Sequence, residues 1–255
     1  MKKLLCFILL SICIIGCSKT NMLEKIKCDQ DDYIACVLLG SNYKDNYGYQ
    51  KAAQLATKAC NDEDFEACYH LGVLYENAQG VEQDYTKAFN LYKKSCEGGF
   101  IYSCNNLAGL YVSGNGTKQD YAKAVKLYTK TCSDEYAVSC YNLGFLYNIG
   151  VGVKQDYTKA IQFYTKACDK NYASACSNLG TLYQKGEGEK QDFVKAVIFY
   201  HKACEKNNAI GCINLGFMYF KGQGIKQDTQ IAKHFFNKAC DLGNNIGCEN
   251  AMQLK

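Results

Sequence analysis

The chain has 255 residues and a formal net charge of +4, and it contains no arginine, proline or tryptophan. Its acidic residues are intermixed with lysines, so it lacks the arginine-bearing basic surface with which proteins bind nucleic acid. Its 17 cysteines are many for an intracellular protein and point to a compartment that permits disulfides.

The first predicted element is a lipoprotein signal peptide over residues 1–16. Lys2 and Lys3 precede an apolar stretch of 12 residues, which is too short to span a membrane, since spanning takes about 20. The stretch ends in Ile-Ile-Gly-Cys17, which resembles a bacterial lipobox, and the resemblance implies that Cys17 carries the lipid. The alternative is an ordinary secretory signal that ends near a cysteine. We expect an exported protein, lipid-anchored in the bacterial envelope and facing the periplasm or the exterior, with soluble secretion as the alternative.

A short linker over residues 17–24 leads to a repeat domain over residues 25–255. Six cysteines follow one another at intervals of 36 residues, each has a partner eight positions on, and a seventh pair precedes them after a shorter step of 32. Without the three signal-segment cysteines, an even number of 14 remains. The predicted pairs are Cys28–Cys36, Cys60–Cys68, Cys96–Cys104, Cys132–Cys140, Cys168–Cys176, Cys204–Cys212 and Cys240–Cys248.

Each repeat predicts two helices. Leu143, Leu146 and Tyr147 are spaced as i, i+3 and i+4, which places them on one face of a first helix. A Gly-x-Gly loop follows. Asp156 then stands where the N-cap of a second helix would be, and equivalent residues recur in the other repeats.

The cysteine spacing independently predicts a turn between repeats. Eight residues of one helix span about 12 Å, whereas the Cα atoms of bridged cysteines lie within about 7 Å. Cys168 and Cys176 can therefore pair only if the chain reverses between them. Zinc ligation is the alternative use of the cysteines, but no Cys-x2-Cys motif occurs and the histidines are only His70, His201 and His234. We expect no metal and no cofactor.

The motifs Leu-Gly-x-Leu-Tyr, Gly-x-Gly, Gln-Asp-Tyr-x-Lys-Ala and Tyr-x-Lys-Ala-Cys resemble Sel-one-like repeats, which are relatives of the tetratricopeptide repeat. The Cys-x7-Cys pair in every 36-residue unit resembles the cysteine-rich protein (Hcp) family of Helicobacter and Campylobacter. The resemblance implies an all-α fold, a right-handed α/α superhelical solenoid. We expect six helix pairs with an unpaired helix at each end, in a monomer.

The Hcp resemblance also implies penicillin binding and slow β-lactamase activity, which is the alternative function. The sequence shows no catalytic constellation for it. A single Ser-x-x-K motif begins at Ser41, the Ser-Asp-Asn and Lys-Thr-Gly motifs are absent, and the 14 repeat cysteines are expected to be oxidised. The catalytic residues of such an activity stay unassigned.

A column of polar residues on the first helices is the candidate binding site. The residue before the repeated leucine is His70, Asn106, Asn142, Asn178 or Asn214. A carboxamide both donates and accepts hydrogen bonds, so such a column could hold a peptide backbone. The ligand would be a peptide, a host or other protein, a β-lactam or a peptidoglycan-like fragment, bound in a concave groove. The alternative is that these residues bond the neighbouring helix and hold the repeats together.

A second recurring position is a lysine, and it is predicted on the outer, second helices. It serves solubility in our interpretation. The residues are Lys87, Lys123, Lys159 and Lys195.

Overall fold

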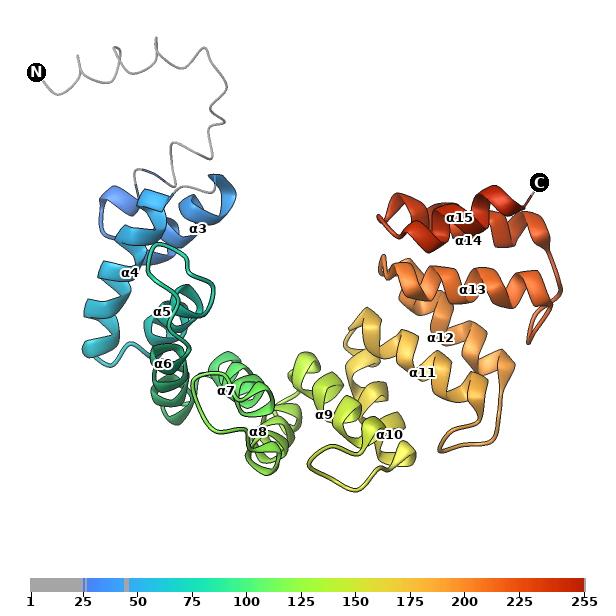
Figure 1. Cartoon of the computed structure of the whole chain (residues 1–255), viewed down its shortest axis with the longest axis horizontal. Coiled ribbons are helices and arrows are strands. Elements are labelled where there is room, and N and C mark those ends of the chain that lie inside the picture. Colours follow the sequence, from blue (N-terminus) through green and yellow to red (C-terminus); the bar gives the residue numbers. More distant parts are fainter. Residues whose placement is uncertain (1–24, 26, 44–45, 255) are drawn as a thin grey trace, which may run out of the picture. The chain divides into compact units, whose positions relative to one another are not determined.

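The structure is a computed structural model that describes residues 25, 27–43 and 46–254. The chain divides into two compact units, one ending at Gln119 and the other beginning at Asp120 (Figure 1). The predicted signal peptide, Cys17 and the linker lie outside the described residues. Within the part of the chain that the structure describes, no helix is both long and apolar enough to cross a membrane.

All regular elements of the described residues are helices. The first helices of the repeats in the two units are α3 (Tyr33–Tyr43), α5 (Phe65–Glu76), α7 (Ile101–Ser113), α9 (Ala137–Ile149), α11 (Ala173–Lys185), α13 (Ala209–Lys221) and α15 (Asn245–Gln253). The second helices are α4 (Asn46–Asn61), α6 (Tyr85–Glu97), α8 (Tyr121–Ser133), α10 (Tyr157–Asp169), α12 (Phe193–Glu205) and α14 (Thr229–Asp241). Within each unit a first helix packs on its own second helix, and each second helix packs on the next first helix. The all-α, paired-helix architecture expected from the sequence is confirmed.

The second helices begin where the aspartates predict. The side chain of Asp156 accepts a hydrogen bond of 2.9 Å from the backbone N–H of Lys159, and this N-cap satisfies a donor that the first turn leaves unpaired. The same bond forms in four other repeats. Its acceptors there are Asp84, Asp120, Asp192 and Asp228.

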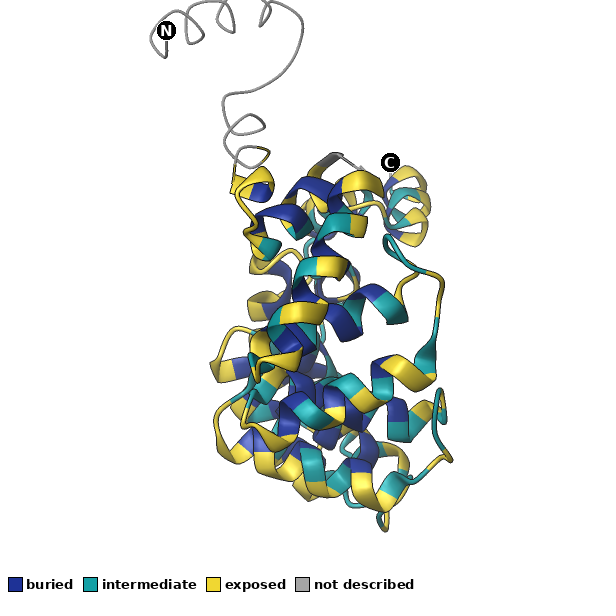
Figure 2. Ribbon diagram, turned by 90° about the vertical axis from the view of Figure 1, so that its left-hand side faces the viewer, coloured by how far each residue is buried: buried dark blue, intermediate teal, exposed yellow. Residues whose placement is uncertain are grey.

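In four helix pairs a buried aromatic ring of the second helix lies against a glycine of the first. Tyr164 on α10 is fully buried, and its ring lies against Gly144 on α9, where an added Cβ would come within 2.8 Å of the ring. Ala160 beside it is also fully buried, so the two helices approach closely. Figure 2 shows such buried residues on the helix sides that face neighbouring helices.

A disulfide closes the turn between one repeat and the next. Cys168 lies near the end of α10 and Cys176 near the start of α11, and their Cα atoms are 4.9 Å apart. The chain reverses between Asp169 and Ala173, as the spacing predicts. In all seven pairs the cysteine bonds to the one eight residues on, with Cα atoms 4.5–4.9 Å apart.

The loops after α5, α7, α9, α11 and α13 dock on the preceding repeat. The second loop glycine, Gly188, has a φ of +83°, and a Cβ there would come within 2.7 Å of the backbone of Tyr157. Thr158 donates its hydroxyl to the carbonyl of the same glycine at 3.2 Å. Glycine is required because the left-handed conformation and the contact both exclude a side chain.

Candidate ligand-binding surface

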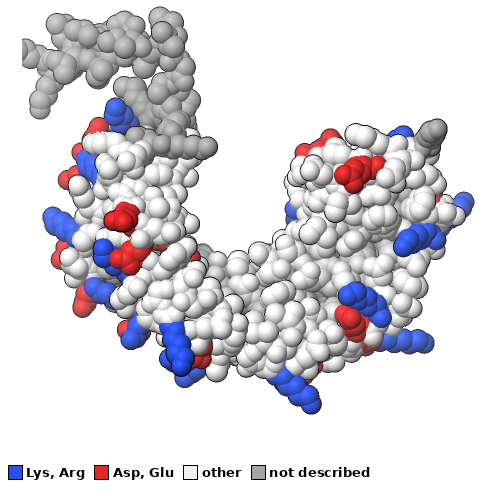
Figure 3. Space-filling model, viewed as in Figure 1, with Lys and Arg blue, Asp and Glu red and all other residues white. Residues whose placement is uncertain are grey.

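The first helices of the second unit carry almost no charge. α9 contains no lysine, aspartate, glutamate or histidine, and α11 and α13 each contain one lysine, at their last residue. The second helices of the same unit each carry at least two lysines. In Figure 3 the area occupied by α9 is correspondingly uncoloured. The surface built by α9, α11 and α13 therefore offers almost no charge with which to select a ligand.

Apolar side chains are exposed on the same helices. Phe145 and Ile149 on α9 are each 43% exposed, and they lie three and seven positions after Asn142, on the same helical face. On α13, Ile210 is 59% exposed and lies four positions before Asn214. We call this stripe of α9, α11 and α13, centred on Asn142, Asn178 and Asn214, the asparagine stripe.

The asparagines of the stripe are partly buried, and Asn142 and Asn178 lie next to tyrosines of the preceding second helices. Burial raises the pKa of Tyr128 to about 12, and a hydrogen bond from the Asn142 carboxamide offsets part of this rise. Burial likewise raises the pKa of Tyr164, and nearby Asn178 lowers it in part. The Tyr164 hydroxyl nevertheless completes no hydrogen bond in the described structure.

Asn106 is held in a continuous chain of side-chain contacts in the first unit. Asn105 donates to its carbonyl oxygen at 3.2 Å. Burial and a hydrogen bond to Glu76 raise the pKa of Tyr92, whereas a hydrogen bond from Asn106 lowers it. The hydroxyl of Tyr92 donates in turn to Glu76 at 2.5 Å. Both ends of the Asn106 carboxamide are therefore engaged within the protein.

His70, the first residue of the predicted column, lies among aromatic rings. Its ring centroid is 6.0 Å from that of Tyr33 and 5.2 Å from that of Tyr69. Burial lowers the pKa of His70, although Glu66, 3.8 Å away, acts in the opposite direction. The side chain is an aromatic packing element, unlike the asparagines at the equivalent positions.

The predicted column thus divides into two groups. Asn106 and Asn142 bond to tyrosines of the neighbouring helix, as the structural alternative expects. Asn178 and Asn214 are partly buried like the other two asparagines. Asn178 lies close enough to Tyr164 to lower its pKa, although that hydroxyl completes no hydrogen bond in the described structure. Within the described part of the column, Asn178 and Asn214 are the asparagines least engaged by the protein itself.

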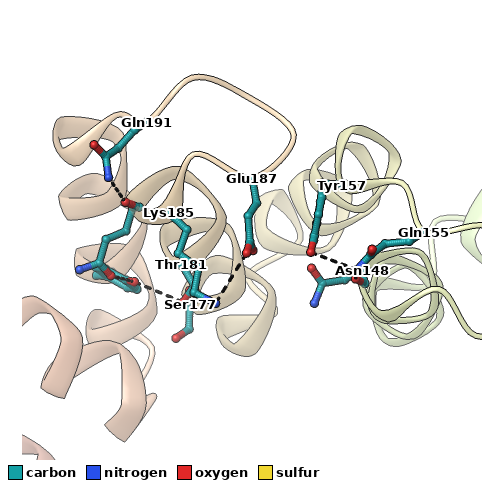
Figure 4. Close-up of polar contacts among 10 residues, drawn as sticks. Asn148, Gln155, Tyr157, Ser177, Thr181, Lys185, Glu187 and Gln191 are labelled. Atoms are coloured by element: carbon teal, nitrogen blue, oxygen red, sulfur yellow. Dashed lines mark hydrogen bonds and ion pairs between the residues drawn. The ribbon is translucent and has the colours of Figure 1, made fainter.

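Polar groups around Asn178 come from α11 itself and from the neighbouring repeat. The hydroxyl of Thr181 lies 3.2 Å from the Ser177 carbonyl and 3.2 Å from the Tyr200 hydroxyl. The Asn208 side chain donates to the Ser174 hydroxyl at 3.4 Å. Figure 4 shows Ser177 and Thr181 together on α11. Hydroxyl and amide groups therefore surround this part of the stripe.

A structural role of the recurring glutamine was not predicted. Gln155 donates from its side chain to the backbone carbonyl of Asn148 at 2.8 Å, which satisfies an acceptor at the end of α9 (Figure 4). The signal was its fixed place before the N-cap aspartate. The other glutamines that bond the carbonyl seven residues earlier are Gln83, Gln119, Gln191 and Gln227.

The recurring lysines lie at the start of the second helices, away from the asparagine stripe. Lys159 is 3.7 Å from its N-cap Asp156, and its ammonium group lies 5.1 Å from the ring centre of Tyr147. Lys87 and Lys195 lie over Tyr75 and Tyr183 in the same way. These lysines cover aromatic rings of the first helices.

The structure adds no support for β-lactam hydrolysis. Ser41 lies in α3, but Lys44, the other end of its motif, lies outside the described residues. All 14 repeat cysteines are in disulfides. Within the described residues no three His, Cys, Asp or Glu side chains are grouped to hold a metal ion.

Comparisons with known proteins agree with this architecture. One solved structure is a Sel1 repeat protein from Oxalobacter formigenes, with 26% identity, a TM-score of 0.78, and coverage of 88% of this chain and 97% of that one. A second is a protective antigen of uropathogenic Escherichia coli with an SLR fold, with 29% identity, a TM-score of 0.75 and coverage of 89% of this chain. The present chain spans half of that antigen's length.

A third solved structure is the Helicobacter pylori cysteine rich protein B. It shares 33% identity over 51% of this chain and 94% of that one, with a TM-score of 0.42. No curated protein matches the chain significantly. The Sel1 repeat family matches residues 65–100, 101–135, 137–172, 173–208 and 209–244, which is more than half of the sequence. The chain is therefore a member of the Sel1 repeat family.

Proposed function

We propose that the chain is an exported binding scaffold that holds an extended segment of a peptide or protein on the asparagine stripe of its second unit. The observation that carries the proposal is the pair Asn178 and Asn214. Their carboxamides are partly buried, complete no hydrogen bond in the described structure and lie on an almost uncharged surface. A carboxamide offers two N–H donors and a carbonyl acceptor, which are the complements of a peptide bond.

The scaffold around the stripe supports this role. Within the second unit each second helix packs on the next first helix, and a disulfide closes the turn between the two. A disulfide loop of eight residues contributes roughly 2.5 kcal/mol in the chain-entropy model. Because packing and disulfides already order these helices, the protein loses less conformational entropy when a ligand binds.

Export is part of the proposal. Seven disulfides are typical of proteins from oxidising compartments, such as the bacterial periplasm. The Ile-Ile-Gly-Cys17 sequence supports lipid attachment at Cys17. Mass spectrometry of the membrane fraction would detect a lipidated Cys17 at the mature N-terminus, and an unmodified N-terminus would refute the anchor.

The binding proposal is tested by capture from envelope and host-cell extracts with wild-type protein and with the double variant Asn178→Ala, Asn214→Ala. Asn237→Ala is the matched control, because Asn237 is an exposed asparagine on the second helix α14 of the same unit. We expect partners that wild type and control retain and the double variant loses. If every captured partner binds the double variant equally well, the stripe is not the binding site.

A further inference from the structure

The asparagine stripe recurs once per repeat, and this period bears on the backbone conformation that a ligand can adopt. Asn178 and Asn214 occupy equivalent positions on α11 and α13, which contact one another in the second unit (Figure 1). Helices in contact have axes roughly 8–10 Å apart. A ligand that meets both asparagines alike must therefore repeat its own backbone at roughly that distance.

A polyproline II helix has this period and a β-strand does not. Polyproline II has three residues per turn and rises about 3.1 Å per residue, so the same face returns about every 9.3 Å. A β-strand returns to the same face every second residue, after about 6.7 Å, and again only after about 13 Å. A strand in register with Asn178 would therefore miss Asn214.

The chemistry of the stripe agrees with that conformation. A polyproline II backbone makes no internal hydrogen bonds, so its carbonyl oxygens are free to accept from carboxamide N–H groups. The exposed Phe145 and Ile210, and the half-exposed Phe217, provide apolar surface against which proline rings can pack. α9 has no charged residue, and the single lysine of α11 lies at its end. The surface thus suits an uncharged segment.

We propose that the ligand class of the asparagine stripe is an uncharged, proline-rich segment in the polyproline II conformation, bound with three ligand residues per repeat. The proposal rests on the proposed function, because it assigns the ligand of that same surface. Asn178 and Asn214 would each donate to a carbonyl of the ligand, three residues apart. The rings of Phe145 and Phe217 would flank the segment.

Two capped, uncharged nonapeptides test the proposal by isothermal titration: (Pro-Pro-Gln)3, which forms polyproline II, and (Val-Thr-Gln)3, which favours β-structure. We expect the proline peptide to bind wild-type protein at least tenfold more tightly than the other. Asn178→Ala and Asn214→Ala should each weaken it about fivefold, the effect of one lost hydrogen bond. The control Asn237→Ala should bind as wild type does. Raising the salt concentration should change little, since no charge is involved.

The other outcomes are distinguishable. If the β-forming peptide binds as well or better, and both stripe variants weaken it, the polyproline II assignment is wrong and the binding surface stands. If neither peptide binds wild-type protein, the assignment is again wrong, and partner capture still decides the proposed function. If the proline peptide binds and neither asparagine matters, both proposals fail at this surface. Circular dichroism spectra of every variant establish that the helices are intact.

Discussion

The hydroxyl of Tyr164 and the side-chain oxygen of Asn148 are both buried, and neither has a hydrogen-bond partner in the described structure. Equivalent positions elsewhere are joined. Tyr200 donates to the side chain of Gln184 at 2.6 Å, and Tyr92 donates to Glu76 at 2.5 Å. Asparagine is one methylene shorter than glutamine or glutamate, so in this repeat the acceptor falls short of the hydroxyl.

This difference predicts that Asn148→Gln stabilises the protein. The longer side chain should reach the Tyr164 hydroxyl, and a bond that also satisfies a buried group contributes about 1 kcal/mol or more. The matched variant is Gln184→Asn, which should break the bond to Tyr200 and destabilise the protein by a similar amount. Urea denaturation measures both. If Asn148→Gln is no more stable than wild type and Gln184→Asn is no less stable, chain length at this position does not matter.

The next prediction concerns Gly144→Ala. Alanine usually stabilises a helix relative to glycine by about 1 kcal/mol. Here the added Cβ would lie 2.8 Å from the fully buried ring of Tyr164, so we expect a net loss of about 1–3 kcal/mol. Thermal unfolding monitored by circular dichroism provides the measurement. In a Tyr164→Leu background the ring is gone, and Gly144→Ala should lower the stability by less. An equal loss of stability in both backgrounds would contradict the packing explanation.

Acid should weaken the caps of the second helices. Hydrogen bonds from the backbone N–H groups of Lys87 and Lys123 hold the pKa values of Asp84 and Asp120 below the ordinary value of 3.8. A carboxyl with a lowered pKa in the folded state stabilises it above the unfolded pKa, and this contribution is lost as the pH falls through the folded pKa. We expect the melting temperature to fall below about pH 4.

The matched variant for this acid effect is Asp84→Asn, Asp120→Asn. Asparagine caps a helix about as well but does not titrate, so the double variant should lose less melting temperature between pH 5 and pH 3. Identical pH profiles for the variant and the wild type would show that these caps do not contribute to the acid response. The comparison needs only thermal scans at matched ionic strength.

Most of the fold could be predicted because its determinants recur at a fixed spacing. Asp156 and the pair Cys168–Cys176 each act on residues close in sequence, so their spacing was sufficient to place the caps and the turns. The contact of Gly188 with Tyr157 of the preceding repeat could not be read from the spacing. The candidate binding site was harder to predict from the sequence. Whether Asn142 faces a ligand or Tyr128 depends on how a first helix lies against the preceding second helix, and the spacing along one helix does not contain that relationship.

The asparagines at equivalent repeat positions differ in their hydrogen bonds, and this difference could not be predicted from the sequence for a physical reason. Asn106 and Asn214 precede the same leucine of the repeat, yet Asn106 has Asn105 beside it, whereas Asn214 follows the buried Ile213. A neighbour that donates a hydrogen bond engages the carboxamide, and an isoleucine cannot. The sequence contained this difference, but only the structure shows that Asn105 points toward its neighbour.

Removal of one disulfide should lower the free energy of unfolding without unfolding the protein. We expect Cys168→Ala, Cys176→Ala to lose roughly 2–3 kcal/mol of stability, because the eight-residue loop is no longer closed in the unfolded chain. Helix content should stay close to that of wild type, since the packing around Leu179 and Tyr200 persists. Chemical denaturation and circular dichroism measure these two quantities.

Mass spectrometry of non-reduced digests checks the pairing itself: a peptide that links Cys96 to Cys132 would overturn the local connectivity.

The last prediction separates the two roles within the column. Asn106→Ala should destabilise the protein by about 1 kcal/mol or more, because it leaves Asn105 without its acceptor and removes a donor from the buried Tyr92. Asn214→Ala removes a partly buried carboxamide that completes no hydrogen bond in the described structure, so stability should change by less than about 0.5 kcal/mol. Binding of the proline peptide should show the reverse order, with Asn214→Ala weakened and Asn106→Ala unchanged. Urea denaturation and titration of the same two preparations give all four values. If Asn214→Ala lost stability as Asn106→Ala does, the whole column would be a structural feature of the repeat packing, and its place in a binding surface would have to be abandoned.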